Sequence, residues 1–340
     1  MKTTKKPYGI AFTLALMIFG LAARLDAQNL YISCLGSNTV AEYALSGTLV
    51  HSAVVANLND PQNIAIYGND LFVANYNAGT IGEYTISGTT VNASLITGLS
   101  NPFGFAVSGT NLFVANTVNG TISEYTLTGQ IINASLITGL SNPQGMATSG
   151  TNLFVVNYGS SSVGEYSTSG VTINASLITG LSEPNYIVIS GTNVFISNFT
   201  GTIGEYTTSG AIIKNPLISG LSDPAGIGIS GTNLFVVSFG NSTVGEYSTS
   251  GATTRASLMT VPGFPRGLAI GPPPQLDIAP YSGQSVLFYP YSSSGTNFIL
   301  QTATNLASTN WLTVTNAVPI IGVIVTNTSP TGFFRLAPAQ

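Results

Sequence analysis

Charged residues, cysteine and histidine are scarce in this sequence of 340 residues. Only 6% of the chain is Asp, Glu, Lys or Arg, and Cys34 and His51 are the single residues of their types. A lone cysteine excludes an intrachain disulfide. A lone histidine excludes a multi-histidine metal site and weighs against a Ser-His-Asp catalytic arrangement. Small polar residues supply the polarity instead, which favours strands and turns over solvent-facing helices.

The first 27 residues have the pattern of a secretory signal. Three lysines before position 7 form a basic region, and residues 10–23 form an apolar stretch too short to span a bilayer comfortably. Ala27 then offers a small residue for cleavage before Gln28. Because no later stretch is a transmembrane candidate, we expect 1–27 to be a signal peptide and the mature chain to be secreted, periplasmic or on the cell surface.

Basic residues are too few for several kinds of partner. Without residues 1–27 the chain keeps four Lys or Arg against eleven Asp or Glu, a net charge of −7. Scattered cations cannot neutralise a row of phosphates, so nucleic acid and anionic membrane surfaces are poor partners. The stretch around Cys34 leaves two readings open, a lipid-anchored cysteine or a small buried side chain within a strand.

An internal repeat of about 41 residues organises the chain from residue 29 to 271, and a period of this length predicts a propeller or an array. Each unit contains four short apolar runs separated by Gly-containing turns, typical of four strands. The run "LFVA" is apolar without alternation, which indicates a strand covered on both faces. The second strand of each unit begins at Leu30, Leu71, Leu112, Leu153, Val194 and Leu234.

The two ends of the repeat complement each other. A proline opens the first strand of each unit, at Pro61, Pro102, Pro143, Pro184, Pro224 and Pro265. The chain therefore begins with strands two to four of one unit, and residues 265–270 supply the missing first strand. This predicts an all-β fold, a six-bladed β-propeller closed by pairing of its N- and C-terminal strands, which leaves few strand edges unprotected.

The repeated pattern "P-x-G-x-A…G-T-N-L-F-V-A-N…I-x-E-Y" resembles the NHL repeat over about 29–271. It departs from the usual NHL form by having Asn75 and its counterparts where that family has Asp. The resemblance implies a propeller of a kind that binds proteins, RNA or small molecules. Related six-bladed rings include gluconolactonase-like hydrolases, so the family indicates the shape and leaves the activity open.

Residues 272–340 read as a separate unit. The run "GPPPQ" predicts a stiff linker, and strand-like segments follow it. The pattern "FILQTATNL…W…V…FFRL" resembles a C-terminal module of many exported bacterial proteins, so we expect a small β-sandwich-like domain with an accessory or anchoring role.

Chain direction separates the two faces of the predicted ring. The loops after the first and third strands are monotonous, whereas those after the second and fourth strands vary: "NYNAGT", "NTVNGT", "NYGSSS", "NFTGT" and "SFGNST". Six identical loops cannot shape an asymmetric pocket, so a specific site should lie on the second face, called here the variable face.

The residues that follow the opening prolines should stand near the channel mouth on the variable face. Their amide, aromatic and guanidinium groups suit a polar ligand or a peptide; the alternative is that they merely fill an unused channel. Asn63 and Tyr186, three blades apart, should face each other across the ring. The candidate ligand-binding residues are Gln62, Asn63, Phe103, Gln144, Asn185, Tyr186 and Arg266.

Acidic residues precede the proline in three units, at Asp60, Glu183 and Asp223. Several oxygen ligands together could hold calcium or another divalent metal, and the resemblance to gluconolactonase-like enzymes implies a channel Glu, Asn and Asp in that role. The competing interpretation is that these are ordinary turn residues. A glutamate also recurs at one position in all six units, and six equivalent carboxylates indicate scaffold, because catalysis needs unlike partners.

We therefore expect an exported, non-enzymatic binding protein that uses the variable face, is a monomer and needs no cofactor. A protein, a peptide or a glycan would be its partner, and no catalytic residue is assigned. The alternative is a metal-dependent gluconolactonase-like hydrolase acting in the channel through Asp60, Glu183 or Asp223. A purely structural surface protein is a third hypothesis. The single histidine counts against the histidine-dependent streptogramin lyases, another group of propellers.

Overall fold

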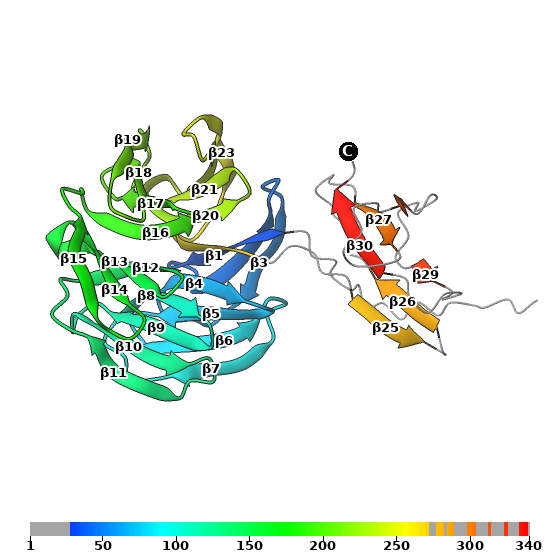
Figure 1. Ribbon diagram of the computed structural model, residues 1–340, viewed down its shortest axis with the longest axis horizontal. Helices are drawn as coiled ribbons and strands as arrows, with labels where there is room; N and C mark the ends of the chain where they lie inside the picture. The colour runs from blue at the N-terminus through cyan, green and yellow to red at the C-terminus, as the bar shows by residue number, and fades with distance from the viewer. Residues whose placement is uncertain are drawn as a thin grey trace, which may run out of the picture.

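The computed structural model describes residues 28–271 and, beyond them, the strands within 277–338. Six four-stranded antiparallel sheets are arranged as blades around a central channel (Figure 1). The predicted all-β, six-bladed propeller is therefore confirmed. The predicted signal peptide lies outside the described residues.

Each blade consists of a first, innermost strand followed by three strands toward the outside. Blade 1 comprises β24 (Pro265–Ile270), β1 (Asn29–Cys34), β2 (Thr39–Ala44) and β3 (Leu49–Val55); blade 2 comprises β4 (Pro61–Tyr67), β5 (Asp70–Asn75), β6 (Thr80–Thr85) and β7 (Thr90–Ile96); blade 3 comprises β8 (Pro102–Ser108), β9 (Asn111–Asn116), β10 (Thr121–Thr126) and β11 (Ile131–Ile137).

The remaining blades repeat this order. Blade 4 comprises β12 (Pro143–Ser149), β13 (Asn152–Asn157), β14 (Ser162–Ser167) and β15 (Thr172–Ile178); blade 5 comprises β16 (Pro184–Ser190), β17 (Asn193–Asn198), β18 (Thr202–Thr207) and β19 (Ile212–Ser219); blade 6 comprises β20 (Pro224–Ser230), β21 (Asn233–Ser238), β22 (Thr243–Ser248) and β23 (Thr253–Thr260). Single 3-10 turns follow β13 and β21, at Tyr158–Ser160 and Phe239–Asn241.

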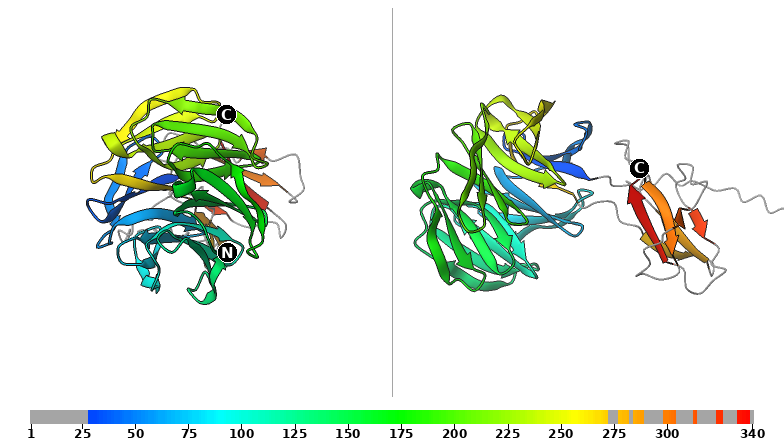
Figure 2. Two further views of the ribbon diagram at one scale, coloured as in Figure 1. Left: turned by 90° about the vertical axis from the view of Figure 1, so that its left-hand side faces the viewer. Right: turned by 45° about the horizontal axis from the view of Figure 1, so that its top comes forward.

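The ring closes as the complementary chain ends predict. β24 pairs antiparallel with β1, with Leu30 opposite Ile270 and Ile32 opposite Leu268. In Figure 2 the blue start and the yellow end of the propeller meet in one part of the ring. β24, the last propeller strand in the sequence, thus completes the blade that contains the first strand, β1.

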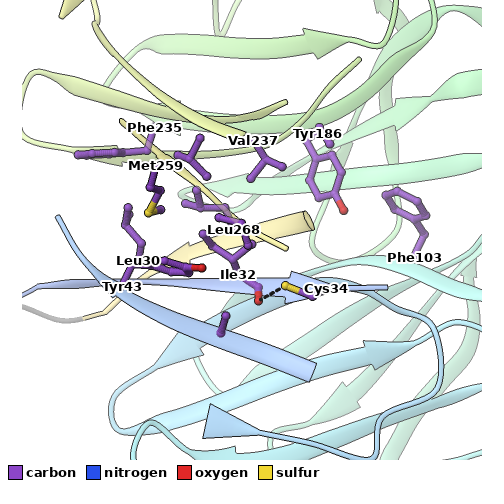
Figure 3. Packing of buried hydrophobic residues seen from close by; sticks show 14 residues of the cluster. Leu30, Ile32, Cys34, Tyr43, Phe103, Tyr186, Phe235, Val237, Met259 and Leu268 are labelled. Atoms are coloured by element: carbon purple, nitrogen blue, oxygen red, sulfur yellow. Dashed lines mark hydrogen bonds between the residues drawn. The ribbon is translucent and has the colours of Figure 1, made fainter. Parts of the chain in front are cut away.

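Apolar cores lie between neighbouring blades. Leu71 and Val73 of β5 pack with Tyr31 and Val40 of blade 1, while Phe72 and Ala74 on the other face of β5 pack with Leu112 and Val114 of blade 3. This two-sided cover explains why the second strands are apolar without alternation. The cluster shown in Figure 3 closes the ring between blades 6 and 1, with Phe235 and Val237 near Leu30 and Ile32.

The recurring glutamate of the third strands has the same structural partner in five blades. Its Oε1 accepts a hydrogen bond from the side-chain amide of the asparagine that begins the second strand, at 2.7–2.8 Å. The five pairs are Glu42–Asn29, Glu124–Asn111, Glu165–Asn152, Glu205–Asn193 and Glu246–Asn233. Blade 2 has Asp70 in place of the asparagine, and its Glu83 is less buried than the other five. These carboxylates belong to the scaffold.

Cys34 ends β1 and is buried, with 1% of its surface exposed. Its Sγ lies 3.6 Å from the carbonyl oxygen of Ile32 (Figure 3). Burial raises the pKa of the Cys34 thiol to about 11. In the folded propeller the thiol is therefore neutral and packs as a small apolar group.

The C-terminal strands form two three-stranded sheets, ordered β25-β26-β29 and β28-β27-β30. Their bounds are Asp277–Tyr281, Gln284–Phe288, Phe298–Ala303, Leu312–Thr313, Val323–Val325 and Phe333–Pro338 for β25 to β30. The linker 272–276 lies outside the described residues, and the sandwich-like packing of the two sheets stays a prediction. Within the described part of the chain, no helix is long and apolar enough to cross a membrane.

Candidate functional site at the channel mouth

The loops sort onto two faces as the chain direction predicts. The loops after the second and fourth strands hydrogen-bond to each other, for example through the Tyr76 amide and the Asp60 carbonyl at 3.1 Å. On the opposite face, the loops after the first and third strands hydrogen-bond to each other, for example through the Leu127 amide and the Thr110 carbonyl at 3.1 Å. The variable loops therefore share one face and the monotonous loops share the other, called here the repeated face.

A β-bulge after each opening proline shapes the channel mouth. In blade 2, Pro61 pairs with Asn75 and Ile64 with Val73, so Gln62 and its neighbour together face one residue of the next strand. The same register shift follows the proline in the other five blades. Bulges redirect side chains, and here they place the two residues after each proline at the channel.

Glycine occupies the second of these two positions in four blades because the first strands approach closely there. A Cβ on Gly145 would lie 2.6 Å from the carbonyl oxygen of Asn185, and one on Gly267 would lie 2.6 Å from that of Gln62. Tyr186 occupies the same position in blade 5, and its hydroxyl donates a 2.7 Å hydrogen bond to the Gln62 carbonyl of blade 2. This bond crosses the channel between blades three apart.

The residues predicted to stand at the mouth converge, but they are buried more than an open mouth would allow. Gln62, Asn63, Phe103, Gln144, Asn185 and Tyr186 each expose no more than 9% of their surface. The rings of Phe103 and Tyr186 contact each other with centroids 5.4 Å apart (Figure 3). This aromatic pair fills the channel at the level of the bulges.

Two cavities lie along the channel, one on either side of the aromatic pair. The cavity of about 350 Å³ is lined by the first strands down to Ile66, Ile189, Ile229 and Ile270, with Asn63 and Tyr186 at its inner end. The other, on the variable face, measures about 290 Å³. We call this second cavity the cup; it is lined by Gln62, Tyr76, Phe103, Thr117, Asn142, Gln144 and Arg266.

The cup contains buried polar atoms that lack a hydrogen-bond partner. Gln144 exposes 9% of its surface, and its Oε1 has no partner in the structure. Nε of Arg266 is likewise buried and unpartnered, and no carboxylate of the described residues forms an ion pair with this arginine. Most buried polar groups in proteins are paired. Four other residues also have a buried, unpartnered side-chain atom, but none of them lines either cavity: Asn157, Asn185, Asn198 and Tyr206.

Arg266 is held by three phenyl rings. Its guanidinium carbon lies 5.5 Å from the ring centroid of Phe103, 5.0 Å from that of Phe199 and 5.2 Å from that of Phe239. Such cation–π contacts are worth about 0.5–2 kcal/mol each, depending on desolvation. These three contacts hold the Arg266 guanidinium between the cup and a row of phenylalanine rings.

Phe199, Phe239 and Phe264 form this row, called here the phenyl arc, with neighbouring centroids 6.0 and 6.1 Å apart. Phe264 is 58% exposed and has a φ of 58°, a strained conformation for a bulky residue. The candidate residues chosen from the sequence do not include the arc, Tyr76 or Thr117. The residue directly after the second strand, which is aromatic in four blades, is the signal that could have found most of them.

The acidic residues before the prolines share one backbone conformation. All six residues before the opening prolines have positive φ: Asp60, Asn101, Asn142, Glu183, Asp223 and Phe264, at 48–58°. Asn and Asp tolerate this left-handed conformation best, which accounts for most of these residues as turn formers. Across the residues that the structure describes, no three His, Cys, Asp or Glu side chains gather into a group suited to a metal ion. Asp60, Glu183 and Asp223 therefore do not form one ligand set.

His51 lies on β3, the outermost strand of blade 1, away from the channel. Its Nδ1 is 3.1 Å from Oε2 of Glu42, and its side chain is 47% exposed. The histidine thus supports the edge of a blade.

No protein-family model matches the sequence, and no curated protein matches it either. Solved structures resemble the fold. A chain of the nidogen/laminin complex superposes with a TM-score of 0.60 at 15% identity, covering 72% of this chain and 98% of that one. A Bacteroides caccae protein of unknown function gives 0.54 at 13% identity, covering 72% and 99%. A streptogramin B lyase gives 0.52 at 16% identity, covering 76% and 94%. At these identities the likeness shows the propeller fold alone.

Proposed function

We propose that this chain is an exported, non-enzymatic binding protein that holds its ligand at the channel mouth of the variable face. One observation carries the proposal: the lining of the cup combines a buried acceptor without a partner, Oε1 of Gln144, with a cation that no described carboxylate pairs with, Arg266. Leaving a buried polar group unpaired costs about 1–3 kcal/mol. A ligand that satisfies these groups would recover that free energy.

The scaffold around the cup supports binding rather than turnover. The recurring glutamates are engaged by asparagines at 2.7–2.8 Å in five blades. General acid–base chemistry needs titratable groups of separated pKa facing one space. The cup has one arginine and no histidine or carboxylate in its lining.

The test is binding of the purified chain to arrays of immobilised glycans and peptides, with two variants that make the same chemical change. Gln144→Leu removes the orphan acceptor of the cup. Gln130→Leu makes this change at an exposed position on the repeated face. We expect selective binding that Gln144→Leu abolishes and Gln130→Leu leaves intact.

The hydrolase alternative is tested in the same preparations. Hydrolysis of a lactone panel, measured with and without added calcium, should show no activity that depends on Glu183. A calcium-dependent activity that Glu183→Gln abolishes would overturn the binding proposal. Array binding that all variants share equally would also count against a site in the cup.

A further inference from the structure

The groups lining the cup require a ligand that both donates and accepts hydrogen bonds. Oε1 of Gln144 can only accept, whereas Nε of Arg266 can only donate, and both are buried without a partner. The side-chain amide of Asn142 adds a donor and an acceptor to the same lining. Hydroxyl groups perform both roles and can rotate to suit either. A ligand rich in hydroxyl groups therefore satisfies the hydrogen-bonding groups of this lining best.

The charges around the cup favour an uncharged ligand. Arg266 is the single basic residue of the lining, and Asp60 lies beside the cup, where its Oδ1 accepts a 3.0 Å hydrogen bond from Nε2 of Gln62. Both charges act on the hydroxyl of Tyr186: burial raises its pKa most, Arg266 lowers it and Asp60 raises it further. An anion would be attracted by Arg266 but repelled by Asp60. A cation would be repelled by Arg266 but attracted by Asp60.

The size and the aromatic lining narrow the ligand further. Phe103 and Tyr76 line the cup beside its amides, and aromatic rings offer apolar faces with little conformational entropy to lose. Small-molecule pockets usually measure about 300–1,000 Å³, so a cup of about 290 Å³ suits one or two sugar rings. A pyranose combines hydroxyls at its edge with an apolar face.

We propose that the cup binds the terminal sugar of a neutral glycan, and that the following sugars pass over the phenyl arc. This inference rests on the proposed binding function of the variable face. Arg266 stands between the two parts, because it contacts Phe103 of the cup and both Phe199 and Phe239 of the arc. Phe264, which is 58% exposed, extends the arc toward solvent.

Isothermal titration calorimetry on the full chain tests this, with three probe sets: neutral oligosaccharides of one to four sugars, oligosaccharides ending in a uronate, and terminally blocked dipeptides. Neutral sugars should bind, and affinity should rise with length. Gln144→Leu should weaken binding of the monosaccharide by about tenfold or more, the loss expected when one buried hydrogen bond is not made. Phe264→Asn should leave the monosaccharide unaffected and remove the gain from added sugars.

Asn185→Leu is the matched control. It removes another buried, unpartnered amide oxygen of the same ring, but from a residue outside the cup, so sugar binding should persist. Preference for uronates or dipeptides that depends on Gln144 would overturn the neutral-glycan inference and leave the proposed binding function standing. If no probe binds in a Gln144-dependent manner and the arrays show none either, both proposals fail. Equal losses with Gln144→Leu and Asn185→Leu would show that the effect is structural.

Discussion

The glutamates of the third strands and the ring of residues after the prolines come from the same repeat, yet their polar side chains differ in pairing. On the third strands one glutamate recurs six times, and in five blades it accepts a hydrogen bond from an asparagine side chain. In the ring the residue changes from blade to blade, and the two members that line the cup, Gln144 and Arg266, keep buried atoms without partners. The recurring glutamates are thus paired within the scaffold, whereas the two unpartnered groups of the cup occupy a position that varies between blades. This contrast is the reason why we propose the site at the ring.

The largest effect should come from breaking a glutamate–asparagine pair. Glu165→Ala leaves the Nδ2 of Asn152 without its 2.7 Å partner, and hydrogen bonds to charged groups are worth about 1.5–3 kcal/mol. Urea unfolding should show this loss, and at least this loss for Glu246→Ala in blade 6, where Oε2 of Glu246 also pairs with Arg255.

Because blades 4 and 6 are separated by another blade, the double variant should lose the sum of the two single values. Glu165→Gln keeps an acceptor and serves as the control, with a smaller loss. A negligible effect of Glu165→Ala would show that the repeated carboxylates are not part of the scaffold.

Tyr186→Phe should cost less, about 1 kcal/mol, the usual net value of one hydrogen bond. It removes the hydroxyl that donates across the channel to the Gln62 carbonyl, which keeps a 3.1 Å hydrogen bond from Oγ of Ser33. Burial raises the pKa of Tyr186, so the hydroxyl stays a neutral donor and the loss measured by urea unfolding should be the same at pH 6 and pH 9. A loss confined to pH 9 would contradict this assignment.

Gln144→Leu should act in the opposite direction on stability. Replacing a buried, unpartnered acceptor with an apolar side chain of similar size removes a desolvation cost, so we expect a gain of about 1 kcal/mol or no change in the absence of ligand. Ligand binding should be lost in the same variant, as is usual when a site is stabilised at the expense of function. A clear loss of stability in thermal unfolding would show that Oε1 has a partner in solution.

The fold was readable from the sequence because its signals repeat. The proline and an apolar second-strand run, "LFVA" or a close variant of it, recur six times at a near-constant period, and the fragment 265–270 completes the first unit. Burial of the ring was not readable, because the β-bulge after each proline depends on how two strands pair. The phenyl arc depends on Phe264 adopting a backbone conformation that Asp, Asn or Glu adopts in the other blades. Single substitutions of this kind carry no periodic signal.

The smallest effect concerns the one blade in which the glutamate lacks its asparagine. Burial raises the pKa of Glu83, and the nearby negative charge of Asp70 raises it further. The folded state therefore holds this proton more tightly than the unfolded state, and the carboxyl destabilises the fold above its raised pKa. Asp70→Asn removes the like charge and supplies the amide that the other five blades have. Because Glu83 is partly exposed, the gain should be below about 1 kcal/mol, or a rise of about 1–4 °C in the unfolding temperature.

The pH dependence of that gain separates repair of the pair from a general loss of negative charge. The gain from Asp70→Asn should be largest at pH 7 and should shrink toward pH 4, because Glu83, whose pKa is raised, takes up its proton as the pH falls. Asp223→Asn, which removes the same charge on the variable face, is the control and should not reproduce this profile. Two outcomes would contradict repair of the pair: a fall in the unfolding temperature with Asp70→Asn at pH 7, or an equal rise with both variants. In either case the charge of Asp70 beside Glu83 would not explain why blade 2 differs from the other blades. The expected profile would instead show that blade 2 carries a local electrostatic conflict that the glutamate–asparagine pair avoids in the other five blades.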